Sequence, residues 1–217
     1  METEAARRPL KTRQAGWAKA LAQLLVRWHV SPNAISMASV FFALAAGAAF
    51  YFSAESSSRE RMLMLVLAAV GIQGRLLCNM LDGMVAIEGG RQTKSGEIFN
   101  DLPDRIADAV IFVCAGYAVW GRPFGVELGY TAAVLAIFTA YVRMLGGSAG
   151  LKQSFIGPMA KQHRMFTLTL ACLLSLFEIW FGMSRTVLWV ALIVINLGCV
   201  VTIVRRTVRV ARELEAR

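Results

Sequence analysis

Residues 79–104 read NMLDGMVAIEGGRQTKSGEIFNDLPD, a polar stretch between two segments that are apolar enough to cross a membrane. On an α-helix, Asn79 and Asp82 are three residues apart and share a face, and Asn100 and Asp104, four apart, also share one. The glycine-broken sequence between the two pairs predicts a bend, so that two helices present their polar faces to each other. Ionisable side chains at membrane depth are costly and mark functional sites, so this stretch is the candidate site of the protein's chemistry.

The composition is that of an integral membrane protein. Of the 217 residues, 57% are hydrophobic and 17% are charged, and the mean hydropathy is +0.55. A soluble domain of this length carries more charge. With a spanning length of about 20 residues, the apolar stretches predict an all-α protein with six transmembrane helices. The expected spans are Ile35–Phe52, Met62–Met80, Arg105–Trp120, Leu128–Leu145, Met165–Phe181 and Thr186–Val204.

The region before the first span has a different character. Residues 1–15 are charged and small, and we expect them to be disordered. Over residues 16–29, tryptophan and leucine recur at helical spacing among basic residues, which predicts an amphipathic helix in the membrane interface. Ser31-Pro32-Asn33 then ends that helix and begins the first span. Since no repeat or low-complexity tract interrupts the chain, we expect one domain over residues 1–217.

Basic residues are distributed unevenly between the two ends of the predicted spans. With the N-terminus inside, 19 of the 23 lysines and arginines fall on one side of the membrane and four on the other. This split follows the positive-inside rule and predicts that both termini are cytoplasmic. The net charge of +9 is then a matter of topology and contact with anionic membrane lipids, so we expect no nucleic-acid partner. The compact length favours a bacterial inner membrane.

Oxygen-bearing side chains gather in and after the polar stretch. Six of the 14 acidic residues lie between positions 82 and 108, and Asp108 extends the face of Asn100 and Asp104 by one turn. Carboxylate and amide oxygens without clustered histidine or cysteine favour Mg²⁺ or Mn²⁺ over zinc. The candidate metal ligands are Asn79, Asp82, Asn100, Asp104 and Asp108.

This spacing resembles the signature of the CDP-alcohol phosphatidyltransferase family, D-x2-D-G-x2-A-R-x8-G-x3-D-x3-D. The intervals match without insertion, and the glycine and alanine positions of the signature are filled by Gly83, Ala86 and Gly96. The six-span layout and the Ser31-Pro32-Asn33 sequence at the first span also look like that family.

Three positions depart from the signature. Asn79 and Asn100 stand where the family has its first and third aspartates, and Ile87 stands where it has arginine. The four-position set therefore holds two negative charges instead of four. We expect weaker metal binding, or a greater dependence on the diphosphate of the substrate. Because one asparagine falls on each helix, the paired change is typical of a redesigned site rather than of random decay.

The resemblance implies an enzyme of phospholipid biosynthesis. Such an enzyme transfers a phosphatidyl group from a CDP-activated lipid to an alcohol and releases CMP, with the active site open to the cytoplasmic leaflet. By the same resemblance Asp104 is the general base and Asp82 is the remaining anionic metal ligand. A homodimer is also implied. Candidates for contact with the substrate or nucleotide are Gly83, Ala86, Gly96 and Asn33.

Basic residues between positions 152 and 164 lie on the predicted cytoplasmic side. They either bind the phosphate of an acceptor or lipid, or serve only as topological charge. These candidates are Lys152, Lys161, His163 and Arg164. The acceptor stays open between small alcohols and phosphorylated alcohols. Two alternatives to the transferase are a hydrolase of CDP-linked lipids and a non-catalytic lipid- or nucleotide-binding relative that has lost its metal ligands.

Overall fold

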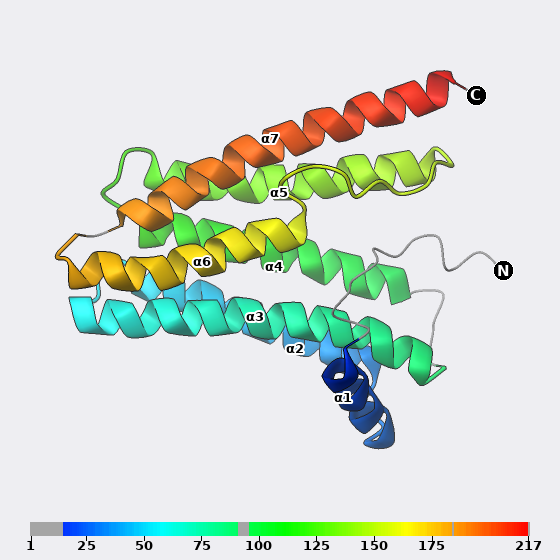
Figure 1. The fold of residues 1–217 in the computed structure, drawn as a ribbon, viewed down its shortest axis with the longest axis horizontal. Helices are drawn as coiled ribbons and strands as arrows, with labels where there is room; N and C mark the ends of the chain where they lie inside the picture. The colour runs from blue at the N-terminus through cyan, green and yellow to red at the C-terminus, as the bar shows by residue number, and fades with distance from the viewer. Residues whose placement is uncertain (1–14, 91–95, 184, 217) are drawn as a thin grey trace.

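The computed structural model describes residues 15–90, 96–183 and 185–216, without the side chains of residues 96, 97, 99 and 100. The predicted disorder of residues 1–15 falls almost wholly outside this part. All regular structure in the described ranges is helical, as expected (Figure 1). The helices are α1 (Gly16–Arg27), α2 (Pro32–Phe52), α3 (Ser58–Glu88), α4 (Gly96–Ala118), α5 (Gly125–Ser148), α6 (Lys161–Trp180) and α7 (Thr186–Glu215).

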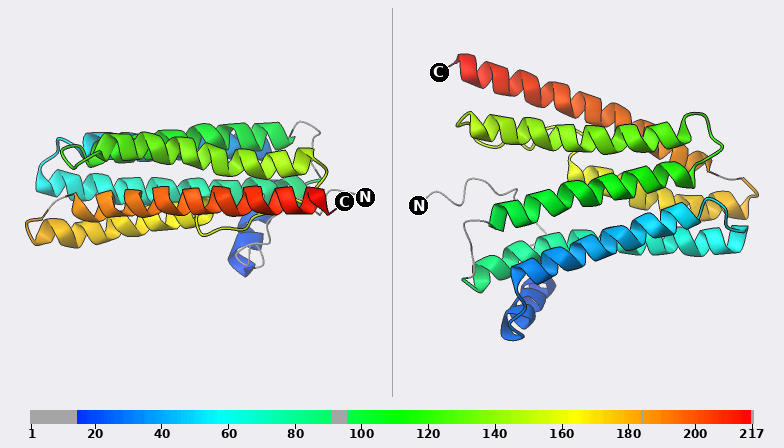
Figure 2. Two further views of the ribbon diagram at one scale, coloured as in Figure 1. Left: turned by 90° about the horizontal axis from the view of Figure 1, so that it is seen from above. Right: turned by 180° about the vertical axis from the view of Figure 1, so that it is seen from behind.

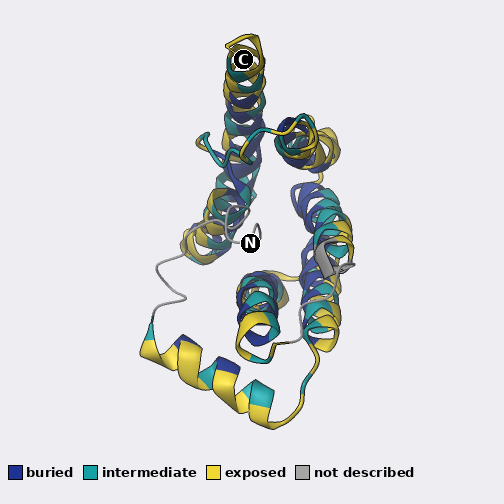
Figure 3. Ribbon diagram, turned by 90° about the vertical axis from the view of Figure 1, so that its right-hand side faces the viewer, coloured by how far each residue is buried: buried dark blue, intermediate teal, exposed yellow. Residues whose placement is uncertain are grey.

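Six of the helices form a ring. Going around it, the order of the main packing contacts is α2, α3, α6, α7, α5, α4 and back to α2, while α1 packs against α3. The ring helices run along the long axis of the molecule, and α1 crosses that direction steeply (Figures 1 and 2). Viewed along the helices, the buried faces turn towards neighbouring helices (Figure 3).

Glycines allow the closest helix crossings. A Cβ atom on Gly71 of α3 would lie 2.9 Å from the backbone oxygen of Phe42 on α2. At the crossing of α4 with α5, a Cβ atom on Gly129 would lie 2.7 Å from the Cα atom of Gly116. Small residues at such crossings let helix backbones approach within a membrane. These crossings therefore fix the spacing of α2 and α4 against their neighbours.

Four helices, α2, α3, α5 and α7, are long and apolar enough to cross a membrane. Helices α4 and α6, with 23 and 20 residues, are also long but carry charged residues along their length, including Asp101, Asp104 and Asp108 on α4. The described residues thus form an all-helical membrane protein with four candidate spans, and the six-span arrangement stays a prediction.

Several helices extend beyond the expected spans. Helix α3 runs to Glu88, so the first half of the polar stretch belongs to a continuous membrane helix. Helix α4 begins at Gly96 and continues through Pro103 into the expected span, so it carries both Asn100 and Asp104 as the spacing predicts. Helix α7 continues past the apolar residues to Glu215, where an ion pair of 2.6 Å between Arg209 and Glu213 joins successive turns.

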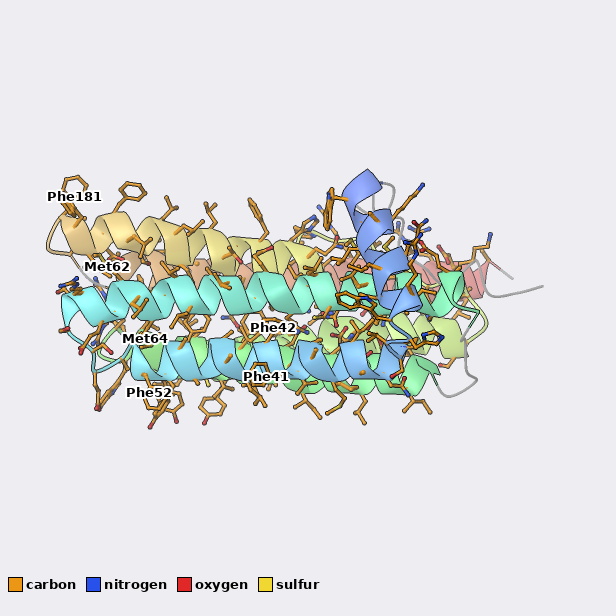
Figure 4. The ribbon with its side chains drawn as sticks, turned by 90° about the horizontal axis from the view of Figure 1, so that it is seen from below. Phe41, Phe42, Phe52, Met62, Met64 and Phe181 are labelled. Atoms are coloured by element: carbon orange, nitrogen blue, oxygen red, sulfur yellow. The ribbon has the colours of Figure 1, made fainter. Side chains whose placement is uncertain are left out.

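The outward surface of the ring is apolar. Phe41 and Phe52 of α2 project away from the bundle, as does Phe181 after α6 (Figure 4). Exposed aromatic residues in such number suit contact with lipid rather than water. On α1, Ala22 is buried against α3 whereas Trp17 is exposed, which gives the helix one packed and one open face. Its place in the membrane interface stays a prediction.

One end of the ring carries the polar stretch. Figure 1 shows α1, the end of α3, the start of α4 and the end of α7 at this end of the molecule. The start of α2 also belongs here, where the Ser31 hydroxyl accepts a hydrogen bond from the Ala34 N–H at 3.2 Å and Pro32 occupies the first turn. This is the expected role of Ser31-Pro32-Asn33 as a helix start.

Candidate active site

Asp82 lies on the inner face of α3, near its end. Its side chain is buried, and one carboxylate oxygen accepts a hydrogen bond from the Ser36 hydroxyl of α2 at 3.0 Å. The other oxygen contacts the backbone N–H of Gly83. Within the described ranges, the ion pairs involve other carboxylates, so the contacts of Asp82 are with neutral donors. A buried carboxylate without a cation in contact carries an uncompensated cost of desolvation.

Asp104 lies on α4 and receives donors from two other helices. Its Oδ1 atom accepts from Asn79 Nδ2 at 2.8 Å and from Arg75 at 3.2 Å, both on α3. Its Oδ2 atom contacts the ammonium group of Lys161, the first residue of α6, and lies 3.9 Å from the guanidinium of Arg105 on α4. Asp104 is therefore an anion held by both charged and neutral donors.

Asp108, one turn further along α4, is held by two guanidinium groups. Arg75 approaches its Oδ1 atom at 2.7 Å and Arg164 its Oδ2 atom at 2.9 Å. Arg164 also donates to Thr139 of α5 at 2.9 Å. Asp108, Arg75 and Arg164 are each at most 1% exposed, so the group forms a buried ion-pair network across α3, α4, α5 and α6.

The two polar helix faces meet, as the sequence predicts. Asn79 shares the face of Asp82 on α3 and bonds directly to Asp104 on α4. Asp82 and Asp104 therefore belong to one polar site and do not point to opposite ends of the molecule.

The other candidate residues on the signature lie around these carboxylates. Gly83 and Ala86 are half-buried on α3, and Asn33 is exposed in the first turn of α2, one turn before Ser36. Gly96 and Asn100 lie in the first turns of α4, but the direction of the Asn100 side chain falls outside the described part of the chain.

The basic segment 152–164 divides into two pairs. Lys161 and Arg164 reach inward to the carboxylates of α4. Lys152 and His163 are exposed, and the His163 ring contacts the backbone oxygen of Pro158 at 2.8 Å. Only the first pair joins the carboxylate cluster.

Sequence reasoning missed two residues of this site. It counted Arg75 among the topological charges, whereas the structure buries that guanidinium between Asp104 and Asp108. The available signal was spacing, because Arg75 lies one turn before Asn79 on the same helix face. Ser36 gave no such signal, since its contact with Asp82 depends on how α2 packs against α3.

The donor set fits one divalent cation better than several. In the described part of the chain, no group of three or more histidine, cysteine, aspartate or glutamate side chains forms a ready metal site. Asp104 and Asp108 already contact cations, whereas Asp82 does not. Mg²⁺ is commonly bound by one or two carboxylates, with water and substrate phosphates completing its shell. Asp82, with the amide oxygen of Asn79 one turn away, meets this requirement.

The fold and the site together define the class of protein. It is a helical membrane bundle that buries a cluster of carboxylates and cations at one end. The model of the family named CDP-alcohol phosphatidyltransferase matches residues 29–212. The chain belongs to the CDP-alcohol phosphatidyltransferase family, as the signature indicated. The expected enzyme class is thereby confirmed: a transferase of phospholipid biosynthesis that acts on CDP-linked substrates.

Relatives cover most of the chain at low identity. A protein of Aquifex aeolicus without an assigned function is 25% identical over 199 residues, which are 91% of this chain and 90% of the relative. The phosphatidylinositol phosphate synthase of Streptomyces avermitilis is 26% identical over 198 residues, 88% of this chain and 77% of the relative.

Solved structures of a Mycobacterium tuberculosis phosphatidylinositol phosphate synthase share the fold. The complex with manganese and citrate gives a TM-score of 0.74 at 20% identity and covers 89% of this chain and 88% of the other. The form with CDP-DAG bound gives a TM-score of 0.74 at 22% identity and covers 90% and 94%.

Proposed function

We propose that this protein transfers a phosphatidyl group from a CDP-activated lipid to an alcohol and releases CMP, although two signature aspartates are asparagine. The observation that carries this proposal is the difference between two neighbouring carboxylates. Asp82 is buried against neutral donors, whereas Asp104 is surrounded by donors from Arg75, Asn79 and Lys161. The carboxylate of Asp82 is thus suited to bind a metal ion, and that of Asp104 to accept a proton.

The proposed metal ion, Mg²⁺ or Mn²⁺, is held by Asp82 with Asn79 and Asn100 as neutral ligands. When bound, such an ion neutralises the diphosphate and favours departure of CMP. The manganese in the related M. tuberculosis structure supports this choice of ion. Asp108 has a different proposed task, since both its oxygens face arginines: it fixes Arg75 and Arg164 beside the site.

Asp104 is the proposed acceptor of the proton from the attacking hydroxyl. An ionised carboxylate offers about four lone-pair sites, two on each oxygen. Arg75 and Asn79 fill those of Oδ1, and Lys161 takes one on Oδ2. One site on Oδ2 is left, because Arg105 lies 3.9 Å away, beyond hydrogen-bonding distance. An acceptor hydroxyl placed there can pass its proton to Asp104 while its oxygen attacks the phosphorus and CMP leaves.

The proposed donor is a CDP-linked lipid, and CDP-DAG bound to the M. tuberculosis relative supports it. Gly83 and Ala86 present little side-chain bulk on the half-buried face beside Asp82, where we place the nucleotide. We place Gly96 and Asn33 at the border of this nucleotide site.

We also propose that the chain forms one domain with six membrane spans and assembles as a homodimer. Both termini and the active site are then on the cytoplasmic side of a bacterial inner membrane. The basic residues at the polar end of the ring support this orientation.

Phosphorylated alcohols are the proposed acceptors, because the segment that ends in the inward-facing Lys161 and Arg164 also carries Lys152 and His163, which are exposed. We expect kcat/KM for glycerol phosphate or inositol phosphate to exceed that for the unphosphorylated alcohol by about tenfold or more, the effect of one charge-assisted hydrogen bond. Lys152→Gln combined with His163→Gln should narrow this ratio. Equal turnover of glycerol and glycerol phosphate would count against a phosphorylated acceptor.

The proposed function is tested by CMP release from CDP-diacylglycerol by the purified protein with Mn²⁺, across a panel of alcohols. Release that requires an alcohol supports the transferase. Equal release in its absence identifies a hydrolase of the same substrate. Nucleotide binding without turnover identifies a silent relative, and either of these results overturns the proposal.

A further inference from the structure

Lys161 is held in place by the connection that precedes α6. The backbone N–H of Met159 donates to the Thr202 hydroxyl of α7 at 3.0 Å. Gly157 has a φ of +116°, and a Cβ atom there would lie 2.5 Å from Thr202 Cγ2, so the connection packs directly on α7. This anchoring places Lys161 at the start of α6, with its ammonium against Asp104. Lys161 is therefore a built part of the site rather than a surface lysine.

The three buried carboxylates of the site, Asp82, Asp104 and Asp108, differ in their contacts with cations. Four cations contact the last two: Arg75, Arg105, Lys161 and Arg164. The one carboxylate without a cation in contact is Asp82, so a divalent ion has a single favourable position in the described part of the site.

A second divalent ion at Asp104 would meet cations already in place. It would lie beside the Lys161 ammonium and the Arg75 guanidinium, both in contact with that carboxylate. Like charges at such short range repel strongly, and burial weakens the screening by water. Lys161 therefore occupies the position from which Asp104 would otherwise bind a metal.

The substitutions in the signature agree with this reading. Asn79 and Asn100 remove two negative charges from the four-aspartate pattern. Two negative charges are what one divalent cation neutralises. The loss of negative charge on α3 and α4 and the cation supplied by α6 both make the site more positive, so both disfavour a second divalent ion.

We propose that this enzyme binds one divalent cation per active site, at Asp82, and that the ammonium of Lys161 is the permanent cation at Asp104. This inference rests on the proposed function, because it specifies the metal content of the same site. It makes Lys161 a positioning residue that holds Asp104 ionised and aligned beside the substrate.

The test is a count of bound Mn²⁺ by electron paramagnetic resonance, on the purified full chain in lipid nanodiscs with saturating CDP as the nucleotide probe. We expect one Mn²⁺ per chain in the wild type. Lys161→Gln keeps a hydrogen-bond donor but removes the charge, and we expect two, with the spectral broadening of neighbouring Mn²⁺ ions. Lys161→Arg keeps the charge and should bind one, as should the matched control Lys19→Gln at an exposed lysine of α1.

Two Mn²⁺ ions in the wild type, or in Lys161→Arg, would overturn the inference, and so would a single ion in folded Lys161→Gln. If Lys161→Gln does not fold, the number of Mn²⁺ ions bound by the wild type and by Lys161→Arg still tests the inference. CMP release measured on the same samples separates the two proposals. If the wild type binds two Mn²⁺ ions per chain and releases CMP, only the inferred metal count is overturned. If it binds one Mn²⁺ ion per chain and does not release CMP, only the proposed function is overturned.

Discussion

Asp104→Asn should lower acceptor-dependent CMP release by about 10²- to 10⁴-fold, the contribution expected of a positioned proton acceptor. The amide keeps nearly the same shape and can still accept from one side, but it cannot take a proton from the acceptor hydroxyl. The measurement is kcat for CMP release from CDP-diacylglycerol at saturating alcohol and Mn²⁺.

Asp101→Asn is the matched control for this substitution. Asp101 lies one turn earlier on α4, is partly exposed, and pairs with Arg143 at 3.0 Å and with Arg105 at 3.4 Å. We expect its kcat to stay within about threefold of the wild type, because a partly exposed ion pair contributes little free energy. If Asp104→Asn retained activity within tenfold of the wild type, the proton would have to leave by another group.

Arg75→Met should destabilise the folded protein by about 3–5 kcal/mol, the cost of removing one partner from a buried ion pair. The guanidinium is fully buried and is shared between Asp104 and Asp108. Methionine fills much of the volume but leaves both carboxylates with one cation fewer. The measurement is the free energy of unfolding in mixed detergent micelles, with the melting temperature as a second reading.

Two further variants separate charge from packing. Asp108→Asn added to Arg75→Met removes one of the uncompensated charges and should restore part of the lost stability. Arg143→Met breaks the partly exposed pair with Asp101 and should cost less than about 1 kcal/mol. A cost for Arg75→Met as small as that for Arg143→Met would show that the buried network does not stabilise the fold.

Local patterns in the sequence predicted the features that depend on one helix at a time. Spacing alone placed Asn79 with Asp82 on one face of α3 and Asp104 with Asp108 on one face of α4, and the structure brings these faces together. Ser31 and Pro32 marked the start of α2 correctly, because capping depends on neighbouring residues.

Features that depend on packing between distant segments could not be predicted. Lys161 reaches Asp104 across 57 positions of sequence, and this contact requires α6 to pack beside α3 within the ring. Arg75 was misjudged because an arginine near the end of an apolar stretch usually extends towards water. Here it meets two carboxylates from another helix, which a hydropathy pattern does not reveal.

The most direct measurement is the identity of the lipid made from CDP-diacylglycerol by the purified wild-type protein, read by mass spectrometry in the presence of a phosphorylated alcohol and Mn²⁺. We predict a phospholipid that carries the alcohol on the phosphate of diacylglycerol, in amounts equal to the CMP released. Phosphatidic acid as the lipid product, or no product at all, would contradict phosphatidyl transfer at Asp82 and Asp104.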